Sequence, residues 1–205
     1  MNAVNNFKLI APLLSWQEVG DYYYCQLILR KKDGTTTFGN KNNNARLIKA
    51  YTFFNLEQFQ RKEEEIIELC ELFKCRAGIS LNRRNEERIT VELLKQLSDR
   101  IASYNYIGIN GLLNTANGRQ TSQDRIWLID CDTQDEHDKV MNILSTEDIR
   151  PHGDKVIAVV PTYKGHHIVT NKFDVFHFNQ LCKDVYLKVE IHKNNPVALY
   201  YPEKD

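Results

Sequence analysis

The sequence predicts an α+β fold in which one open sheet carries its helices mainly on one face. Segments typical of strands and helices alternate along much of the chain, and strands then follow one another toward its end, an order typical of this class. The 205 residues are 42% hydrophobic and 26% charged, which suits a globular chain with a sizeable core. Without an internal repeat or linker, residues 1–55 are expected to form a β-rich N-terminal extension that packs with residues 56–205 as one compact unit.

The first part of the chain contains three predicted strands and a first predicted helix. Residues 22–32 and 45–54 are rich in β-branched and aromatic side chains, which favours strands. The Asn- and Gly-rich segment 38–44 between them predicts a loop. Asn55 and Gln58 have the spacing of a helix cap, and apolar residues then recur at helical spacing (Ile66, Leu69, Cys70 and Phe73). Alternating polar and apolar side chains predict a third strand over residues 76–82.

The remaining elements follow from the same patterns. A second helix is expected where Ile89, Leu93, Leu97 and Ile101 share one face, and a long loop over the Asn- and Gly-rich residues 110–123. Thr133 and Glu136 form a capping box, which predicts a helix directly after the apolar strand 125–132. The rest of the chain predicts further strands at 155–162, 166–170, 185–193 and 197–202, and a short helix at 174–182.

The composition argues against a membrane-spanning, secreted or disulfide-rich protein. No apolar run approaches the ~20 residues that a membrane span needs, and the N-terminus lacks the features of a signal peptide. The five cysteines are scattered without a C-x-x-C pair, so they are expected to be reduced core residues in the cytoplasm. Net charge is zero, but residues 30–49 carry six basic side chains against one acidic one. Such a local basic patch is compatible with nucleic-acid binding or with an ordinary solvated surface.

The strand RIWLIDCD places two carboxylates where burial is expected. Residues two apart on a strand share a face ~6.6 Å apart, so Asp130 and Asp132 are neighbours, while Trp127, Ile129 and Cys131 occupy the other face. Repulsion makes such a pair costly unless a cation relieves it. Carboxylate oxygens suit Mg²⁺ or Mn²⁺, so this strand is a candidate metal site. The alternative is a pair of surface aspartates beside a loop.

Two later strands add polar groups. Gly165 is expected to allow a tight turn with positive φ, with Lys164 and His167 beside it. Because adjacent strand residues point to opposite faces, one of His166 and His167 faces the site. Glu190 lies on the polar side of the last-but-one strand and is either a third acidic ligand or an exposed glutamate.

These groups together are typical of a phosphoryl-transfer site, in which metals bridge carboxylates and triphosphate while basic groups hold the phosphates. The sequence has no G-x-x-x-x-G-K-[ST] loop, no G-x-S-x-G elbow and no zinc signature. Those absences argue against a P-loop enzyme, an α/β-hydrolase and a zinc enzyme.

The three motifs LIDCD, PTYKGHHIVT and VEI, in this order after the strand CRAGISLNRRN, resemble the archaeo-eukaryotic primase superfamily. Its members include compact primase–polymerases of phages and plasmids. The resemblance covers roughly residues 70 to 200 and implies a primase–polymerase-like fold with an RRM-type core. A glutamate stands here where the family has an aspartate in its third motif.

The resemblance implies roles for particular residues. Asp130, Asp132 and Glu190 would be the catalytic, metal-binding acids, with Mg²⁺ or Mn²⁺ as cofactor. The nucleotide would contact Lys164, Gly165 and His167, together with Arg76, Arg83 or Arg84.

Three functions remain open on the sequence alone. The leading hypothesis is a metal-dependent nucleotidyltransferase of primase–polymerase type that acts on nucleoside triphosphates and a DNA or RNA template. The second is a non-catalytic nucleotide- or nucleic-acid-binding protein on the same fold. The third is a structural interaction protein without a ligand.

Overall fold

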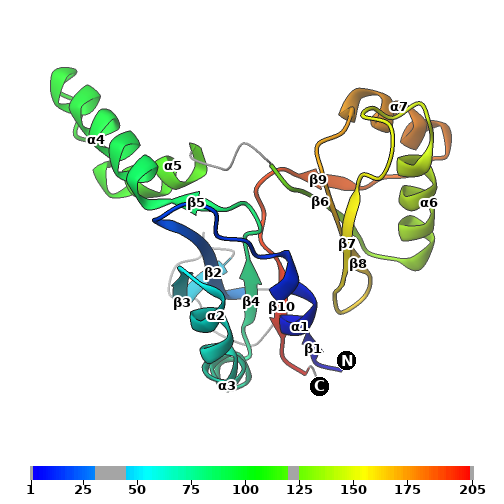
Figure 1. Cartoon of the computed structure of the whole chain (residues 1–205), viewed down its shortest axis with the longest axis horizontal. Helices are drawn as coiled ribbons and strands as arrows, with labels where there is room; N and C mark the ends of the chain where they lie inside the picture. The colour runs from blue at the N-terminus through cyan, green and yellow to red at the C-terminus, as the bar shows by residue number, and fades with distance from the viewer. Residues whose placement is uncertain (1, 31–44, 120–124, 204–205) are drawn as a thin grey trace.

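A computed structural model describes residues 2–30, 45–119 and 125–203. Its strands form two antiparallel sheets (Figure 1). The first sheet has the order β1-β10-β4-β2-β3, and β5 pairs with the start of β2. Its strands are β1 (Val4–Asn5), β2 (Asp21–Arg30), β3 (Ala45–Phe53), β4 (Arg76–Ile79), β5 (Arg84–Asn85) and β10 (Val197–Tyr201). The second sheet has the order β7-β8-β6-β9, with β6 (Trp127–Cys131), β7 (Val156–Pro161), β8 (His166–Thr170) and β9 (Glu190–His192).

The helices divide between the two sheets. Beside the first sheet lie α1 (Phe7–Ile10), η1 (Ala11–Leu13), α2 (Leu56–Arg61) and α3 (Glu63–Phe73). The second sheet is covered on its outer side by α6 (Gln134–Ser145) and α7 (Val175–Asp184) (Figure 1). A third group projects away from both sheets: α4 (Glu86–Ala102), η3 (Ile109–Gly111) and α5 (Leu112–Arg119). We call this group the helical arm. No helix in the described ranges is both long and apolar enough to cross a bilayer.

Strand alternation builds the core of each sheet. On β2, Cys25, Leu27 and Leu29 are buried in the cluster that also contains Phe59 and Ile66 of the covering helices. The core of the second sheet contains Trp127, Ile129 and Cys131 of β6. They pack against buried side chains of α6 and α7 (Val140, Ile143, Leu144, Phe178 and Cys182). The opposite face of β2 carries the polar side chains Gln26 and Arg30, and that of β6 carries Asp130.

The two sheets are joined by apolar and polar contacts. Leu128, Val160 and Val169 of the second sheet belong to the buried cluster of the first. Asn82, which is 3% exposed, donates to the carbonyls of Ile126 and Lys193 and accepts from the Ile126 amide. The Asn82 side chain therefore fixes the main chain just before β6 and just after β9.

Much of the predicted secondary structure is confirmed. Asn55 caps α2 by accepting from the Gln58 amide, and Thr133 and Glu136 form the predicted capping box of α6. The short helix predicted at 174–182 is α7, which begins after its N-cap residue Asp174. All five cysteines are buried and free, as predicted.

Two expectations need correction. The α+β class holds, but the predicted single sheet is two sheets, because β6 to β9 pair with one another rather than with β2–β4. Residues 1–55 contain β1, β2 and β3, and β2 pairs with β4 in the middle of the first sheet. The predicted loop 110–123 forms α5 over Leu112–Arg119. The predicted loop 38–44 lies outside the described residues.

Candidate functional site

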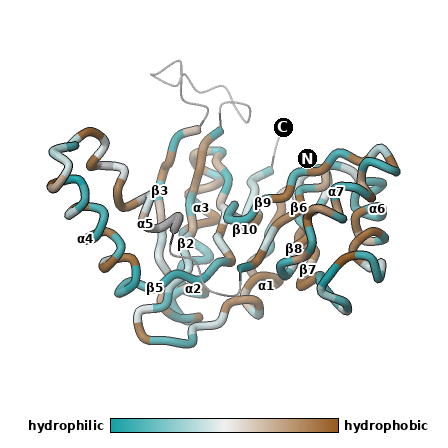
Figure 2. The backbone as a smooth tube through the Cα atoms, turned by 90° about the horizontal axis from the view of Figure 1, so that it is seen from above, coloured by the Kyte–Doolittle hydropathy of each residue, from teal (hydrophilic) through white to brown (hydrophobic). Residues whose placement is uncertain are grey.

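A pocket of about 810 Å³ lies between the two sheets. One wall consists of side chains on β2 and β4, among them Gln26, Arg30 and Arg76. The other wall consists of residues from β6, from the hairpin between β7 and β8, and from β9. Figure 2, viewed from above, shows the strands of the second sheet beside β10 of the first. The pocket is therefore built by segments that are far apart in the sequence.

Asp130 stands at the centre of the second wall. Its strand lies between β8 and β9, and Asp130 pairs in register with His167 on one side and with Glu190 on the other. Asp132, one residue beyond the strand, lines the same pocket. Because Ile129 points into the core beneath α6 and α7, the predicted separation of acidic and apolar faces on this strand is confirmed. The residues of the three sequence motifs therefore meet in one place.

The carboxyl group of Asp130 is poorly disposed to carry its charge. Burial raises its pKa above the usual range, and the negative charge of Asp132 raises it further, against the opposing effects of His192 and Arg30. This is the electrostatic pattern of two crowded acids. A positive charge placed between Asp130 and Asp132 would favour the ionised form of both.

The main chain at Asp132 is fixed by the following helix. Glu136 accepts hydrogen bonds from the amides of Asp132 (2.7 Å) and Thr133 (3.1 Å), and the Thr133 side chain accepts from the Glu136 amide. The capping box therefore positions an acid of the pocket as well as starting α6. Glu136 itself lines the pocket, which the sequence pattern did not indicate.

Gly165 is required by a close approach of two chain segments. A Cβ atom at this position would lie 1.9 Å from the carbonyl oxygen of Cys131 and 2.7 Å from the carbonyl carbon of Asp132. The positive φ expected for Gly165 is wrong. Among the described residues, Gly165 is not one of those with a left-handed backbone. The glycine instead lets the β7–β8 turn lie directly against the peptide that joins Cys131 and Asp132.

His167 faces the pocket, and its neighbour faces away. The ring of His166 lies 5.0 Å from that of His137 on α6, whereas Nε2 of His167 lies 3.6 Å from Oδ1 of Asp130. Burial, together with the nearby positive charges of His192, Arg30 and Arg76, lowers the pKa of His167 to about 4. His167 is therefore neutral at neutral pH.

Arg76 of β4 lies against two aromatic rings that also contact each other. Its guanidinium carbon lies 4.9 Å from the ring centroid of Tyr163 and 4.7 Å from that of Tyr201. Cation–π contacts of this kind fix the orientation of a guanidinium group. Lys164, on the turn beside Tyr163, is exposed and also lines the pocket. Arg76, Lys164 and His167 thus present nitrogen atoms to the same space.

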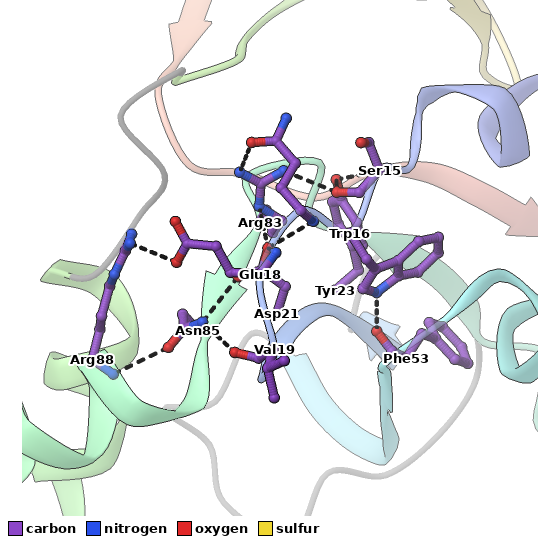
Figure 3. Close-up of polar contacts among 11 residues, drawn as sticks. Ser15, Trp16, Glu18, Val19, Asp21, Tyr23, Phe53, Arg83, Asn85 and Arg88 are labelled. Carbon is purple, nitrogen blue, oxygen red and sulfur yellow. Dashed lines mark hydrogen bonds and ion pairs between the residues drawn. The ribbon is translucent and has the colours of Figure 1, made fainter.

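Arg83 and Arg84 do not line this pocket. Arg83 pairs with the buried Asp21 at 2.9 Å and donates to the Ser15 carbonyl and to Gln17 (Figure 3). Arg84 is buried, with its guanidinium carbon 5.1 Å from the ring centroid of Tyr24. Both arginines therefore stabilise the segment around β5.

Several lining residues were not assigned to the site from the sequence. Arg30, Lys188 and His192 all face the pocket. Strand alternation contained a signal for Arg30, because Cys25, Leu27 and Leu29 occupy the opposite face of β2. Of the basic segment 30–49, only Arg30 among the described residues reaches the pocket. Lys49 instead pairs with Glu65 at 2.6 Å, and Lys31, Lys32 and Lys41 lie outside the described residues.

The carboxylates of the site do not form a closed metal cage. Within the part of the chain that the structure describes, no three His, Cys, Asp or Glu side chains are gathered closely enough to hold a metal ion. The carboxylate of Glu190 is 84% exposed and lies 3.4 Å from Nε2 of His192.

Comparison with protein-family models, curated proteins and solved structures gives no match to this chain.

Proposed function

We propose that the chain is a metal-dependent nucleotidyltransferase of primase–polymerase type, with the fold of that class and an RRM-type second sheet. The observation that supports it is the meeting of six predicted groups in one pocket: Asp130, Asp132, Lys164, His167, Glu190 and Arg76 all line it. The six come from four separate chain segments, so neighbouring positions in the sequence do not account for their convergence. Acids on one wall and cations beside them are the donor types that phosphoryl transfer uses.

The donor set fits a hard divalent cation. Asp130 and Asp132 offer carboxylate oxygens, the ligands that Mg²⁺ and Mn²⁺ prefer. The pKa of Asp130 is raised by burial and by the charge of Asp132, and a bound cation would offset both effects. Glu190 is exposed enough to change rotamer and become a third ligand. A cation bound there would neutralise triphosphate charge and favour ionisation of an attacking hydroxyl.

The basic groups are positioned to hold phosphates. The neutral His167 donates from Nε2 without adding a charge, and the stacked Arg76 offers a rigid fork of donors suited to phosphate oxygens. Lys164 lies at the pocket mouth on an exposed turn. We expect the template, DNA or RNA, to lie along the open side of the pocket and to bind with salt-sensitive affinity.

A second function, nucleotide or nucleic-acid binding without chemistry, is favoured by one observation. The three acids are not gathered into a preformed ligand group within the described residues. On this reading the basic groups hold the ligand, and the acids only shape the pocket. It predicts tight nucleotide binding in the presence of a chelator.

The test is incorporation of labelled nucleotides on single-stranded DNA and RNA templates with Mg²⁺ or Mn²⁺. We expect Asp130→Asn and Asp132→Asn each to lower the rate by about 100-fold or more. Asp135→Asn is the matched control, because Asp135 is an exposed acid on α6 that pairs with Lys139. Calorimetric titration of nucleotide with and without the metal separates the two functions. Binding that needs no metal, with no incorporation, would leave only the second function.

A further inference from the structure

The pocket between the two sheets has two unlike ends. At one end the side chain of Asn82 hydrogen-bonds to carbonyls just before β6 and just after β9, so the two walls are joined there. Of the lining residues on β4 and β6, Gly78 and Leu128 lie nearest to this junction. Arg30 of β2 and Asp132 after β6 line the pocket farther from Asn82. We call the part of the pocket beside Gly78 and Leu128 the junction end.

The junction end has an apolar floor. Gln26 of β2 pairs in register with Gly78 of β4, and a Cβ atom on Gly78 would lie 3.0 Å from Cβ and 3.3 Å from Cγ of Pro196. The ring of Pro196 therefore lies directly over the main chain of Gly78. Ile28 and Leu128 add further apolar side chains to the lining. Such a surface suits a flat ring that has little charge.

Gln26 adds a polar group to the junction end. Because Cys25 and Leu27 are buried in the core of the first sheet, strand alternation turns Gln26 into the pocket. Among the described residues, the side-chain amide of Gln26 has no hydrogen-bond partner. A carboxamide presents donors and an acceptor together, as the edge of a nucleobase does. Gln26 is therefore able to pair with such an edge.

We propose that the junction end receives the base of a bound nucleotide, which packs on Pro196 and hydrogen-bonds to Gln26, while the phosphates lie toward Arg30 and Lys164. The inference rests on the proposed function, because it takes the ligand to be a nucleotide. Gln26 and Arg30 are ~13 Å apart along β2, a length that the sugar and phosphates of an extended nucleotide can bridge. The reverse orientation would set phosphates against Leu128 and Pro196 and leave Arg30 and Lys164 beside the base.

Titration calorimetry in Mg²⁺ tests the role of Gln26. The probes are the four ribonucleoside and four deoxyribonucleoside triphosphates, together with inorganic tripolyphosphate, which has the phosphates without a base. The wild type should bind its preferred nucleotide about tenfold or more tighter than tripolyphosphate. Gln26→Met, which keeps the size of the side chain, should lower that nucleotide affinity about tenfold and leave the tripolyphosphate affinity unchanged. Gln60→Met is the matched control, because Gln60 is exposed on α2 and does not line the pocket.

Photo-cross-linking locates the base directly and needs no variant. The probe 8-azidoadenosine triphosphate carries its reactive group on the base. After irradiation, peptide mapping should find the label on the segment around Gln26 or on the segment around Pro196, and an excess of ATP should remove it. A label confined to the β7–β8 hairpin around Lys164 would place the base at the opposite end and overturn the proposed orientation.

The outcomes separate this inference from the proposed function. If nucleotides and tripolyphosphate bind equally well and Gln26→Met changes neither affinity, the junction end does not bind the base, although phosphate binding in the pocket stands. If Gln26→Met weakens both probes equally, the side chain does not act on the base, and the inference is again wrong. If no probe binds, the proposed function and the inference fail together.

Discussion

The main-chain amide of Ala198 donates a hydrogen bond to Nδ1 of His167 over 3.2 Å. Nδ1 therefore carries no proton, and the neutral ring must carry its proton on Nε2, the nitrogen that faces Asp130 at 3.6 Å. A strand of the first sheet thus sets the tautomer of a histidine on the second. The pocket receives a donor with no charge, held in one orientation.

The first prediction concerns pH and stability. The pKa of His167 is about 4 in the folded chain and about 6.5 when unfolded. The unfolded state therefore binds more protons between these values, so the folded state loses stability as pH falls through this window. From pH 7 to pH 5 the contribution of His167 should fall by about 2 kcal/mol. Urea unfolding at the two pH values measures it.

The control for this prediction is His167→Asn. The amide oxygen of asparagine can accept the Ala198 hydrogen bond in place of Nδ1, and the side chain does not titrate. Over the same pH range, the free energy of unfolding of the variant should fall by about 2 kcal/mol less than that of the wild type. The other histidines are common to both proteins, so their effects cancel. Equal losses in the two proteins would contradict the assignment.

The second prediction concerns Gly165. Gly165→Ala should destabilise the chain by about 3 kcal/mol or more, because its methyl group would overlap the Cys131 carbonyl and the backbone must shift. Gly111→Ala is the control, since a Cβ there meets nothing within 4 Å, and it should change stability by less than about 0.5 kcal/mol. Thermal unfolding compares the two. A Gly165→Ala chain as stable as Gly111→Ala would show that this close approach is not present in solution.

The third prediction concerns the junction between the sheets. Asn82→Ala removes three hydrogen bonds to Ile126 and Lys193 and leaves buried main-chain groups unpaired, at an expected cost of about 3 kcal/mol. Asn142→Ala on the exposed surface of α6 should be close to neutral. Denaturant unfolding of both variants gives the comparison. An Asn82→Ala chain with wild-type stability would refute a joining role for this residue.

The fourth prediction separates two arginines that the sequence analysis grouped together. Arg83→Met should cost about 2 kcal/mol of stability, because it removes the partner of the buried Asp21, yet leave nucleotide affinity per folded molecule unchanged. Arg76→Met should lower that affinity about tenfold or more, since Arg76 lines the pocket. Calorimetric titration and unfolding curves on both variants decide it. Equal affinity losses in the two variants would place Arg83 at the ligand.

The acidic strand shows what the sequence predicts well. Strand alternation separated Asp130 from Ile129 correctly, and the spacing of Thr133 and Glu136 located the start of α6. Both are local rules, set by the two-residue period of a strand and by hydrogen bonds within one turn of helix. The pairing of Asp130 with His167 and Glu190 is different, because it depends on strand order, which local pattern does not encode.

The predictions that the structure contradicts have equally specific physical causes. Segment 112–119 is rich in Asn and Gly, which favours a loop, but burial of Leu112 and Ala116 beside α4 provides the stabilisation that helix propensity lacks. Gly165 was identified as important for the wrong reason, since an interatomic overlap with a distant segment is invisible in the sequence. Arg83 was misplaced because its partner, Asp21, lies 62 positions earlier in the chain.

The interleaved order of the two sheets has a consequence for folding. Residues 126–193 contain every strand of the second sheet and both of its helices, so this region can assemble from contacts that are local in sequence. The first sheet needs β10, which leaves a ribosome only after that region. Contacts across such separations form slowly. We expect the last strand to dock late in folding, so that the imidazole of His167 acquires its fixed proton position only at the final step.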